Sequence, residues 1–227
     1  MRAVKLKLTN ISPLNYYYSQ GGQLERPSTF IGDIALKYSM LHQLGLGNFF
    51  DAGSYQPNYS ELTGYDFWFT VAMPLNDSTG QLMGVDFMKP IIRNTMHGID
   101  FNGSNVHPEI NAGSSLYKNF YMQQYLKPGN KFIAYFISEK EMDLPPVLRV
   151  GTGKGGLIKV EKVRDDNQIK AYVNLYTIRN IIRKTDVYDK ISKMTLPYFE
   201  HITLPYIIVG PIEDLRILTM IYERSDH

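Results

Sequence analysis

The chain has no cysteine among its 227 residues. Disulfide bonds, thiolate catalysis and cysteine-ligated metal sites are therefore excluded, and nothing points to an oxidising compartment. Tryptophan is also scarce, with 1 residue, although 17 tyrosines and 11 phenylalanines make the chain rich in aromatic rings. Most of these rings are expected to pack in the core and along strands.

The sequence also has no long hydrophobic run. No stretch approaches the about 18 consecutive apolar residues that a membrane-spanning helix needs. Residues 1–8 alternate charged and apolar side chains, which is unlike the apolar region of a signal peptide. We therefore expect a cytoplasmic protein with no membrane partner.

An excess of charge of one sign is missing too. The 24 Lys and Arg residues nearly balance the 22 Asp and Glu residues, which leaves a formal net charge of +2. A freestanding nucleic-acid-binding protein usually has a clearer basic excess, so any such binding here depends on a local patch. The 44% of hydrophobic and 20% of charged residues are ordinary for a globular domain that has its own core.

The start of the chain has the pattern of a strand, a loop and a helix. Residues 4–8 alternate apolar and charged side chains, as in a strand with one buried face. Residues 27–29 (Pro-Ser-Thr) give a helix-start signal, and apolar residues then recur at helical spacing over 31–44. Gly45 and Gly47 are expected to end this helix.

The rest of the chain is predicted to consist mostly of strands. The candidate strands are residues 65–73, 131–137, 147–150, 157–163, 169–176, 206–209 and 215–222, with a short helix at 186–194. Residues 77–129 have no clear period and form a long irregular insertion. The pattern predicts a single α+β domain over 1–227, with antiparallel strands and helices on one face. A ferredoxin-like core, as in RNA-recognition motifs, is compatible with it.

A glycine-rich motif, residues 151–156 (Gly-Thr-Gly-Lys-Gly-Gly), follows one of these strands. A nucleotide-binding P-loop requires Ser or Thr after its lysine and then a helix, whereas Lys154 precedes Gly155 and a predicted strand. A hairpin turn is the plain interpretation. Alternatively, the glycines allow an RNA phosphate to approach the backbone closely beside Lys154.

The ionisable residues form no recognisable catalytic or metal-binding motif. The 5 histidines include no His-x-x-x-His pair, and no Gly-x-Ser-x-Gly nucleophile elbow occurs. Asp165 and Asp166 are adjacent, which is typical of a hairpin turn with Asn167 and not of a metal pair. We therefore predict neither a metal ion nor another cofactor.

Basic and aromatic residues are better placed for a binding role. Lys154, Lys159, Lys162 and Arg164 flank one predicted hairpin, and residues 16–18 form a loop of three tyrosines. Lysines at such positions usually only solvate a strand face. Together with the tyrosine loop, however, they offer phosphate contacts and stacking platforms, the two devices that bind single-stranded RNA.

Three segments together resemble a known family. The first strand leads to a loop that carries Ser19, residues 31–38 (Ile-Gly-Asp-Ile-Ala-Leu-Lys-Tyr) open the helix, and residues 145–151 (Pro-Pro-Val-Leu-Arg-Val-Gly) follow much later. The chain thereby resembles the Cas-five-type subunit of type I-D CRISPR surveillance complexes, which belongs to the RAMP superfamily. It departs from the family pattern at Gln20 and Gly21, where an Arg-Glu pair is expected.

This resemblance implies a ferredoxin-like core with an inserted β-hairpin thumb, for which the insertion at about 77–129 is the natural candidate. It implies a non-catalytic subunit, because a separate Cas-six-type nuclease processes the guide RNA (crRNA) in these systems. The implied partners are the 5′ handle of the crRNA, the large CRISPR subunit and the first Cas-seven-type backbone subunit. The protospacer-adjacent motif of the target DNA duplex is expected nearby.

The candidate RNA-binding residues follow from this role. We expect Tyr17, Tyr18, Ser19 and Gln20 to contact bases or backbone of the handle after the first strand. The candidates for phosphate contacts are basic residues spread along the chain: Lys37, Arg93, Lys118, Lys154 and Lys159.

Two alternatives stay open. One is a metal-independent endoribonuclease that cleaves the CRISPR repeat, with His97 or a lysine and a tyrosine as general acid or base. The other is a β-rich structural or assembly protein without a nucleic-acid role. Cleavage of a repeat RNA by the isolated protein identifies the first, and a protein-only absorbance spectrum of the purified assembly favours the second.

Overall fold

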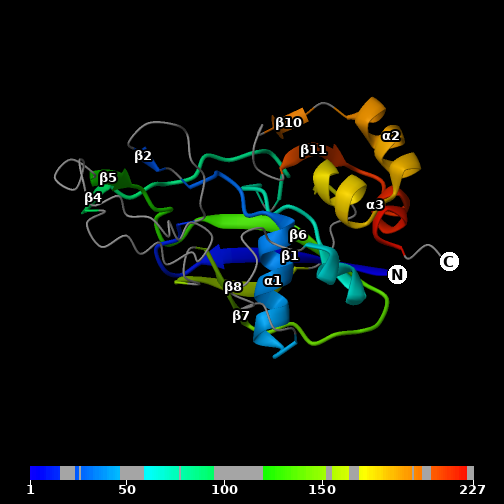
Figure 1. Cartoon of the computed structure of the whole chain (residues 1–227), viewed down its shortest axis with the longest axis horizontal. Coiled ribbons are helices and arrows are strands. Elements are labelled where there is room, and N and C mark those ends of the chain that lie inside the picture. The colour runs from blue at the N-terminus through cyan, green and yellow to red at the C-terminus, as the bar shows by residue number, and fades with distance from the viewer. Residues whose placement is uncertain are drawn as a thin grey trace, which may run out of the picture.

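The computed structural model describes residues 1–15, 24–25, 27–46, 59–76, 78–94, 120–151, 155–163, 169–195, 197–200 and 206–223. At 24–25, 91–94 and 120–122 it describes the backbone alone. Within these stretches the fold is mixed α/β, with a curled antiparallel sheet and a few helices (Figure 1).

A five-stranded antiparallel sheet forms the centre of the fold, with the strand order β3-β6-β1-β8-β7. Its strands are β1 (Arg2–Asn10), β3 (Phe67–Phe69), β6 (Lys131–Ser138), β7 (Val147–Val150) and β8 (Gly156–Lys162). The first strand lies between β6 and β8 and pairs with both. Leu6 and Leu8 of β1 are fully buried, as the alternating pattern of residues 4–8 predicted.

The helix α1 (Asp33–Gln43) lies across one face of this sheet (Figure 1). Gly32 is its N-cap residue, and Gly45, with φ +68°, follows its last turn. Glycine adopts a positive φ without strain and commonly ends a helix in this way. The predicted helix is therefore confirmed, and Gly45 follows its end as expected, while Gly47 lies outside the described residues. A 3₁₀-helix, η1 (Tyr59–Gly64), precedes β3.

The C-terminal part of the chain forms a second group of elements, which we call the C-terminal lobe, at the upper right of Figure 1. Its sheet has the strand order β10-β11-β9. The lobe contains β9 (Ala171–Asn174), the π-helical turn η4 (Thr177–Ile181), α2 (Thr185–Met194), β10 (Pro197–Glu200), β11 (Ile207–Ile212) and α3 (Leu215–Tyr222).

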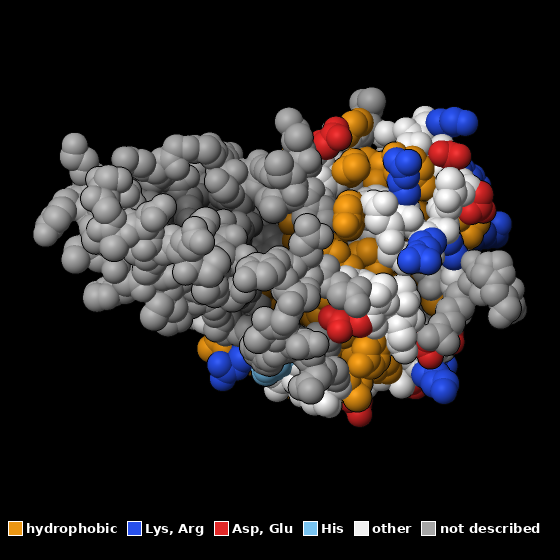
Figure 2. All heavy atoms as spheres, viewed as in Figure 1, with side chains coloured by type: hydrophobic (Ala, Val, Ile, Leu, Met, Phe, Trp, Pro, Cys, Tyr) orange, Lys and Arg blue, Asp and Glu red, His pale blue; other side chains and the backbone are white. Residues whose placement is uncertain are grey.

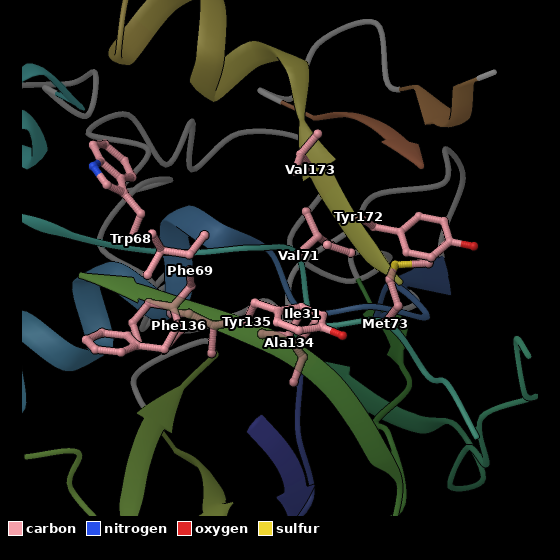
Figure 3. Packing of buried hydrophobic residues seen from close by; sticks show 14 of the residues in the cluster. Ile31, Trp68, Phe69, Val71, Met73, Ala134, Tyr135, Phe136, Tyr172 and Val173 are labelled. Atoms are coloured by element: carbon pink, nitrogen blue, oxygen red, sulfur yellow. The ribbon is translucent and has the colours of Figure 1, made fainter. Parts of the chain in front are cut away.

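The C-terminal lobe shares one hydrophobic core with the main sheet, part of which Figure 3 shows. The backbone N–H of Val71 donates to the carbonyl of Tyr172 at 2.9 Å, so the segment after β3 pairs with β9. Trp68 of β3 stacks on Tyr222 of α3, with ring centroids 6.0 Å apart. The lobe and the sheet are therefore packed against each other through side chains that lie far apart in the sequence.

A buried carboxylate at the start of α1 joins the helix to the C-terminal lobe. Asp33 is 2% exposed, and its Oδ1 accepts a hydrogen bond from Asn174 Nδ2 at 3.0 Å. Its Oδ2 accepts a hydrogen bond from the hydroxyl of Thr177. Asn174 Oδ1 accepts from the backbone N–H groups of Tyr176 and Ile207, each at 3.1 Å. These bonds connect α1, β9, η4 and β11 at one point.

A third set of strands lies in and beside the insertion. The strand β4 (Ile91–Asn94) pairs antiparallel with β5 (Phe120–Gln123), and β5 pairs parallel with β2 (Leu24–Glu25). Residues 95–119, between β4 and β5, lie outside the described residues. The insertion, which shows no clear period in the sequence, therefore contains paired strands.

Most of the other predicted elements are confirmed. The strands 131–137, 147–150 and 157–163 correspond to β6, β7 and β8, the helix 186–194 to α2 and the strand 206–209 to β11. The segment 65–73 forms β3 and then isolated bridges, and the strand predicted at 169–176 is limited to β9. These segments have strong period-2 or helical patterns, which depend on neighbouring residues alone.

The prediction that residues 215–222 form a strand is wrong, because they form the helix α3. The side chain of Asp214 accepts a hydrogen bond from the backbone N–H of Arg216 at 2.8 Å and so caps the helix. Its buried residues recur at helical spacing: Leu218, Ile221 and Tyr222. Isoleucines and a tyrosine favoured a strand, but the capping aspartate and this spacing stabilise a helix.

The glycine-rich motif connects β7 and β8, which pair antiparallel as a hairpin. The element after it is a strand, so the hairpin interpretation is confirmed and the helix of a P-loop is absent there. Gly151 has φ +92°, and a Cβ there would lie 2.5 Å from Asn15 O. A Cβ at Gly156 would overlap the side chain of Leu14. These two glycines are therefore needed for close packing, while residues 152–154 lie outside the described part of the chain.

Replacement of Asp33 by asparagine is expected to remove a pH dependence of stability. Burial raises the pKa of Asp33 above its ordinary value of 3.8, although hydrogen bonds from Thr177 and Asn174 oppose the rise. Between 3.8 and the raised value, the folded chain binds a proton that the unfolded chain has released. The free energy of unfolding therefore falls as the pH rises through this window. Urea denaturation from pH 4 to pH 8 should show this fall in the wild type and a flatter profile in Asp33→Asn.

Asp33→Leu is the matched variant, because leucine has a similar size and cannot accept a hydrogen bond. It leaves the amide of Asn174 and the hydroxyl of Thr177 without this acceptor, which should cost about 2–4 kcal/mol at low pH and less as the wild type loses stability with rising pH. Asp33→Asn keeps an acceptor and should stay within about 1 kcal/mol of the wild type at pH 7. An asparagine variant as unstable as the leucine variant would contradict this account.

Candidate functional site

The face of the main sheet opposite α1 carries lysines. On β1 the even-numbered Leu6 and Leu8 are buried in the core, so the odd-numbered Lys5, Lys7 and Thr9 point to the opposite face. Lys5 is 8% exposed, whereas Lys7 and Thr9 are half-buried. This face therefore becomes accessible toward the C-terminal end of β1.

The register of the neighbouring strands places two further lysines beside this end of β1. Thr9 lies opposite Lys131 of β6 and opposite Lys159 of β8, so these residues form one row across the sheet. Lys7 and Glu161 lie opposite each other in the next row. Two strand spacings, roughly 10 Å, separate the backbones of Lys131 and Lys159. We call Lys7, Lys131 and Lys159 the lysine face.

Among the described residues, the acidic Glu161 lies beside these lysines. Lys159 Nζ and Glu161 Oε1 form an ion pair at 2.9 Å, with side chains that are 53% and 42% exposed. The hydrogen bond from Lys159 lowers the pKa of Glu161, and the positive charges of Lys159, Lys7 and Lys131 add to this effect. The three lysines thus act together on one region of the sheet.

A short hairpin after β3 borders the lysine face. The backbone N–H of Asn76 donates to Gln81 O at 2.8 Å, and that of Met83 donates to Pro74 O at 2.7 Å. The side-chain Oδ1 of Asn76 accepts from the backbone N–H of Ser78 at 2.9 Å. This side-chain bond is the usual way in which asparagine stabilises a turn. We call residues 74–83 the edge hairpin.

A cavity of about 200 Å³ lies between the edge hairpin and the lysine face. Lys7 and Lys131 line it from the sheet, and Asn76 and Ser78 line it from the hairpin. The remaining lining residues are apolar: Leu75, Met83 and Ile133. The cavity therefore has a cationic side, a polar side and an apolar wall.

The structure brings only part of the predicted site together. Lys159 is exposed and belongs to the lysine face. Arg93 lies on β4, where the backbone alone is described. The other predicted contacts lie outside the described residues: Tyr17, Tyr18, Ser19, Gln20, Lys118 and Lys154. They stay predictions.

Lys37, which was predicted to contact a phosphate, is a core residue. Its side chain has 0% exposure, and its Nζ donates to Tyr65 O at 2.9 Å. The ammonium also lies over the ring of Trp68, 3.3 Å from the centroid. The prediction for Lys37 is wrong in this structure, because residues 65–68 cover this side of α1 and separate the ammonium from solvent.

Two residues of the lysine face, Lys7 and Lys131, were not among those predicted from the sequence. The alternation of charge over residues 4–8 was a usable signal for Lys7, because it marks one face of the strand as charged. Lys131 has no such local signal. Only the pairing of β6 with β1 places it beside Thr9.

The described tyrosines with shifted pKa values are shifted away from neutral pH. Burial raises the pKa of Tyr59 to about 12 and also raises that of Tyr38 above its ordinary value. Burial lowers the pKa of Lys184, whose Nζ donates to Met220 O at 2.7 Å. That lysine therefore connects the segment before α2 to α3.

Two other features are absent from the part of the chain that the structure describes. No group of three or more His, Asp or Glu side chains is arranged to hold a metal ion there. No helix in the same residues is long and apolar enough to cross a membrane.

Fold and site together define a mixed α/β protein whose curled antiparallel sheet has a lysine-bearing open face. The family model described as type I-D CRISPR-associated protein Cas5/Csc1 matches residues 1–209. The chain therefore belongs to the type I-D Cas5/Csc1 family of CRISPR-associated proteins, as the resemblance of its motifs predicted. A search of curated proteins found no match.

Among solved structures, the chain is similar to chains of two type III-B assemblies. In the cryo-EM structure of Type III-B Cmr-beta bound to cognate target RNA and AMPPnP, state 1, the TM-score is 0.40 at 10% identity, over 71% of this chain and 63% of that one. In that of Type III-B Cmr-beta bound to cognate target RNA, the TM-score is 0.41 at 10% identity, over 92% and 84%. Both likenesses are weak in sequence and in shape.

Replacement of Lys37 by methionine is expected to lower stability. Methionine keeps the apolar stem but loses the hydrogen bond to Tyr65 O and the cation–π contact with Trp68. The free energy of unfolding should fall by about 1–3 kcal/mol. Urea denaturation with circular dichroism measures the change. Lys140→Met is the matched control, since Lys140 is exposed and should change stability by less than about 0.5 kcal/mol. Equal effects of the two variants would contradict a structural role for Lys37.

Proposed function

We propose that the chain is a non-catalytic RNA-binding subunit of a type I-D CRISPR interference complex, which grips the 5′ handle of the crRNA. Membership of the type I-D Cas5/Csc1 family carries this proposal, and the lysine face supports it as an RNA interface. In this role the chain contacts the large subunit and the first Cas-seven-type backbone subunit. It lies near the protospacer-adjacent motif of the target DNA duplex.

The lysine face is suited to phosphate groups. Its lysines lie on one face of the sheet in neighbouring rows, and each phosphate that a lysine neutralises releases a counterion. Sheets that bind RNA often stack bases on exposed aromatic rings. The described part of this face exposes no such ring, since Tyr135 of β6 is 1% exposed. We therefore propose recognition by charge and shape here, and stacking by the predicted loop with Tyr17 and Tyr18.

The opposite side of the sheet is less suited to RNA. Figure 2 shows the side that carries α1, where Lys and Arg side chains are mixed with Asp and Glu side chains near the edge of the molecule. Mixed charges of this kind attract a polyanion weakly, because their fields cancel at a distance. This contrast supports the lysine face as the RNA interface.

The strand order supports a ferredoxin-like core as part of the proposal. Such a core has the order β-α-β-β-α-β along the chain. Here the main sheet and its helix come in the chain order β1, α1, β3, β6, and β8 pairs with β1 in the sheet. Between β6 and β8 in the chain, where a ferredoxin-like core has its second helix, this protein has the strand β7. We propose the antiparallel pair β4 and β5 as the base of the hairpin thumb.

Exposed apolar side chains support contacts with neighbouring subunits. Four apolar residues at the end of the edge hairpin and just after it are between 37% and 53% exposed: Leu82, Met83, Phe87 and Met88. Apolar groups that are exposed together commonly mark a protein–protein contact. The net charge of +2 also fits a subunit that binds its RNA within an assembly and not alone.

Replacement of all three lysines of the lysine face by glutamine should weaken binding of a labelled crRNA with an intact 5′ handle. If each lysine contacts one phosphate, the log–log slope of affinity against salt should become less steep by about 2, because each contact to single-stranded RNA contributes about 0.7. Fluorescence anisotropy over a salt series, with the full chain alone and in the co-expressed complex, measures this slope.

A triple glutamine variant of the exposed Lys140, Lys190 and Lys193 is the matched control, because it removes the same charge elsewhere. Its slope should stay that of the wild type. Equal losses in both variants would rule out a special role of the lysine face. A scrambled handle bound as tightly as the intact one would contradict the proposed function, and a cleaved RNA on a denaturing gel would make the chain an endoribonuclease.

Glu161→Gln should strengthen binding of the same crRNA by about 2- to 5-fold, because it removes a negative charge from the lysine face. Stability should stay close to that of the wild type, since the ion pair with Lys159 is exposed. Anisotropy at low and moderate salt measures the gain, which should shrink as salt rises. Glu139→Gln, at an exposed position outside the face, is the control. Weaker binding by Glu161→Gln would place the RNA elsewhere.

A further inference from the structure

A row of three side chains beside Lys159, on the open face of the main sheet, extends the proposed function, on which this inference rests. The row consists of Ile11, Leu157 and Arg149, and we call it the base row. We propose that it binds one guanine base of the crRNA handle. The base lies flat on the two aliphatic side chains and presents its acceptor atoms to the guanidinium of Arg149.

Strand register places the base row on one face of the sheet. Arg149 of β7 lies opposite Leu157 of β8. The backbone N–H of Ile11 donates to Leu157 O at 2.8 Å, which continues the pairing of β1 with β8 by one residue. The residues next to them in the strands are buried on the core side: Asn10, Leu148, Val150, Gly156 and Ile158. Because side chains alternate along a strand, the base row points to the opposite face, which carries Lys159.

The two aliphatic side chains of the base row offer a surface for a flat ring. Ile11 is 48% exposed, and Leu157 is half-buried. A ring laid on both side chains would remove their apolar surface from water, which is favourable. Proteins that hold a single unstacked base commonly support it with apolar side chains in this way.

Arg149 supplies the hydrogen bonds that select the base. It is exposed, and within the described part of the chain its guanidinium has no hydrogen-bond or ion-pair partner. A guanidinium holds its N–H donors in a planar fork. This fork matches the O6 and N7 acceptors of guanine, to which it donates two parallel hydrogen bonds. The chemistry of Arg149 therefore favours guanine over the other bases.

The dimensions of the base row suit one base. Neighbouring strands lie roughly 5 Å apart, so about 10 Å separate the backbones of Ile11 and Arg149. Lys159 follows Leu157 by two residues on the same face, roughly 7 Å along the strand. A nucleotide whose base rests on the row therefore has its phosphate near Lys159. The base row is in this way continuous with the lysine face.

The base row is preformed, because the segment after β1 is bonded to the hairpin of β7 and β8. The hydroxyl of Ser12 donates to Gly155 O at 3.4 Å and accepts from the backbone N–H of Leu157 at 2.8 Å. Residues 152–154 of the hairpin lie outside the described residues, and the base row contains none of them. A base can therefore bind without the cost of ordering these side chains' backbone.

The combination of side chains distinguishes a base from a segment of a partner protein. Lys159 is already paired with Glu161, so positive charge alone does not select the occupant. An apolar side chain would cover the aliphatic surface but leave Arg149 without an acceptor. A carboxylate would satisfy Arg149 but leave the aliphatic surface in water. A base does both with one flat group.

The test separates base reading from charge. Arg149→Lys keeps the positive charge, and with it the protection that a charged residue gives the edge strand β7, but loses the planar fork. Arg149→Gln loses the charge as well. Arg216→Lys, at an exposed position of α3, is the matched control. Anisotropy measures binding of synthetic handle RNAs, each with one base changed, to the full chain alone and in the co-expressed complex. Circular dichroism establishes that the variants are folded.

We expect one guanine whose replacement by adenine weakens binding by the wild type and by Arg216→Lys about 10-fold, as loss of one bidentate contact does. Arg149→Lys should lose less than about 2-fold at that position, since it has no fork to lose. Its log–log slope of affinity against salt should stay that of the wild type, because its charge is unchanged.

Ile11→Thr tests the aliphatic part of the base row. Threonine keeps the β-branched shape but replaces apolar surface by a hydroxyl, so the intact handle should bind about 3-fold more weakly. An abasic nucleotide at the position of the guanine should remove this difference from the wild type. Leu215→Thr is the control, since Leu215 is 42% exposed on α3, and it should bind as the wild type does.

Equal guanine preferences of the wild type and Arg149→Lys would overturn the inference, and so would a wild-type profile without such a guanine. A less steep salt slope in Arg149→Gln alone would reduce Arg149 to a phosphate contact. Poorer assembly of the complex with unchanged RNA preferences would identify a protein partner instead. Each result with a retained preference for the handle would leave the proposed function standing. A wild type without any preference for the handle would overturn both.

Discussion

The hydrogen bonds of the buried Asp33 carboxylate are the interaction on which the arrangement of sheet and C-terminal lobe depends. They hold the start of α1 against Asn174 and Thr177, at the junction of β9 and η4. A carboxylate removed from water is costly unless it is hydrogen-bonded, and its position at a helix N-terminus is favourable as well. Because Asn174 also binds the backbone of β11, displacement of this carboxylate would loosen three elements together.

This arrangement determines which part of the main sheet is accessible to solvent. One face of the sheet lies under α1, and the C-terminal lobe packs on the β3 and β6 side, where Tyr135 is buried. The lysine face stays accessible beside the C-terminal lobe and the edge hairpin. Lysines concentrated there give a local positive field although the whole chain carries a net charge of only +2. The average charge therefore does not describe how charge is distributed over this protein.

The comparison of sequence and structure separates local from non-local information. The strand β1, the helix α1 and the hairpin of β7 and β8 were predictable, because alternation, capping and glycine turns act within a few residues. The helix α3 was missed, since its isoleucines and tyrosine favour a strand until its cap and buried spacing are considered. Lys37 was misjudged for a different reason. A lysine on an amphipathic helix is normally solvated, and only the packing of residues 65–68 over α1 buries it.

By itself the sequence determined the family, the exclusion of cysteine chemistry, the limits of the main helix and the strands with clear alternation. It also determined that one side of β1 is charged. Only the tertiary structure decided which lysines act together, because Lys7, Lys131 and Lys159 meet through the pairing of β1 with β6 and β8. The cavity, too, depends on where the edge hairpin folds back onto the sheet. Strand register and packing join residues that are far apart in the chain, and no local pattern encodes them.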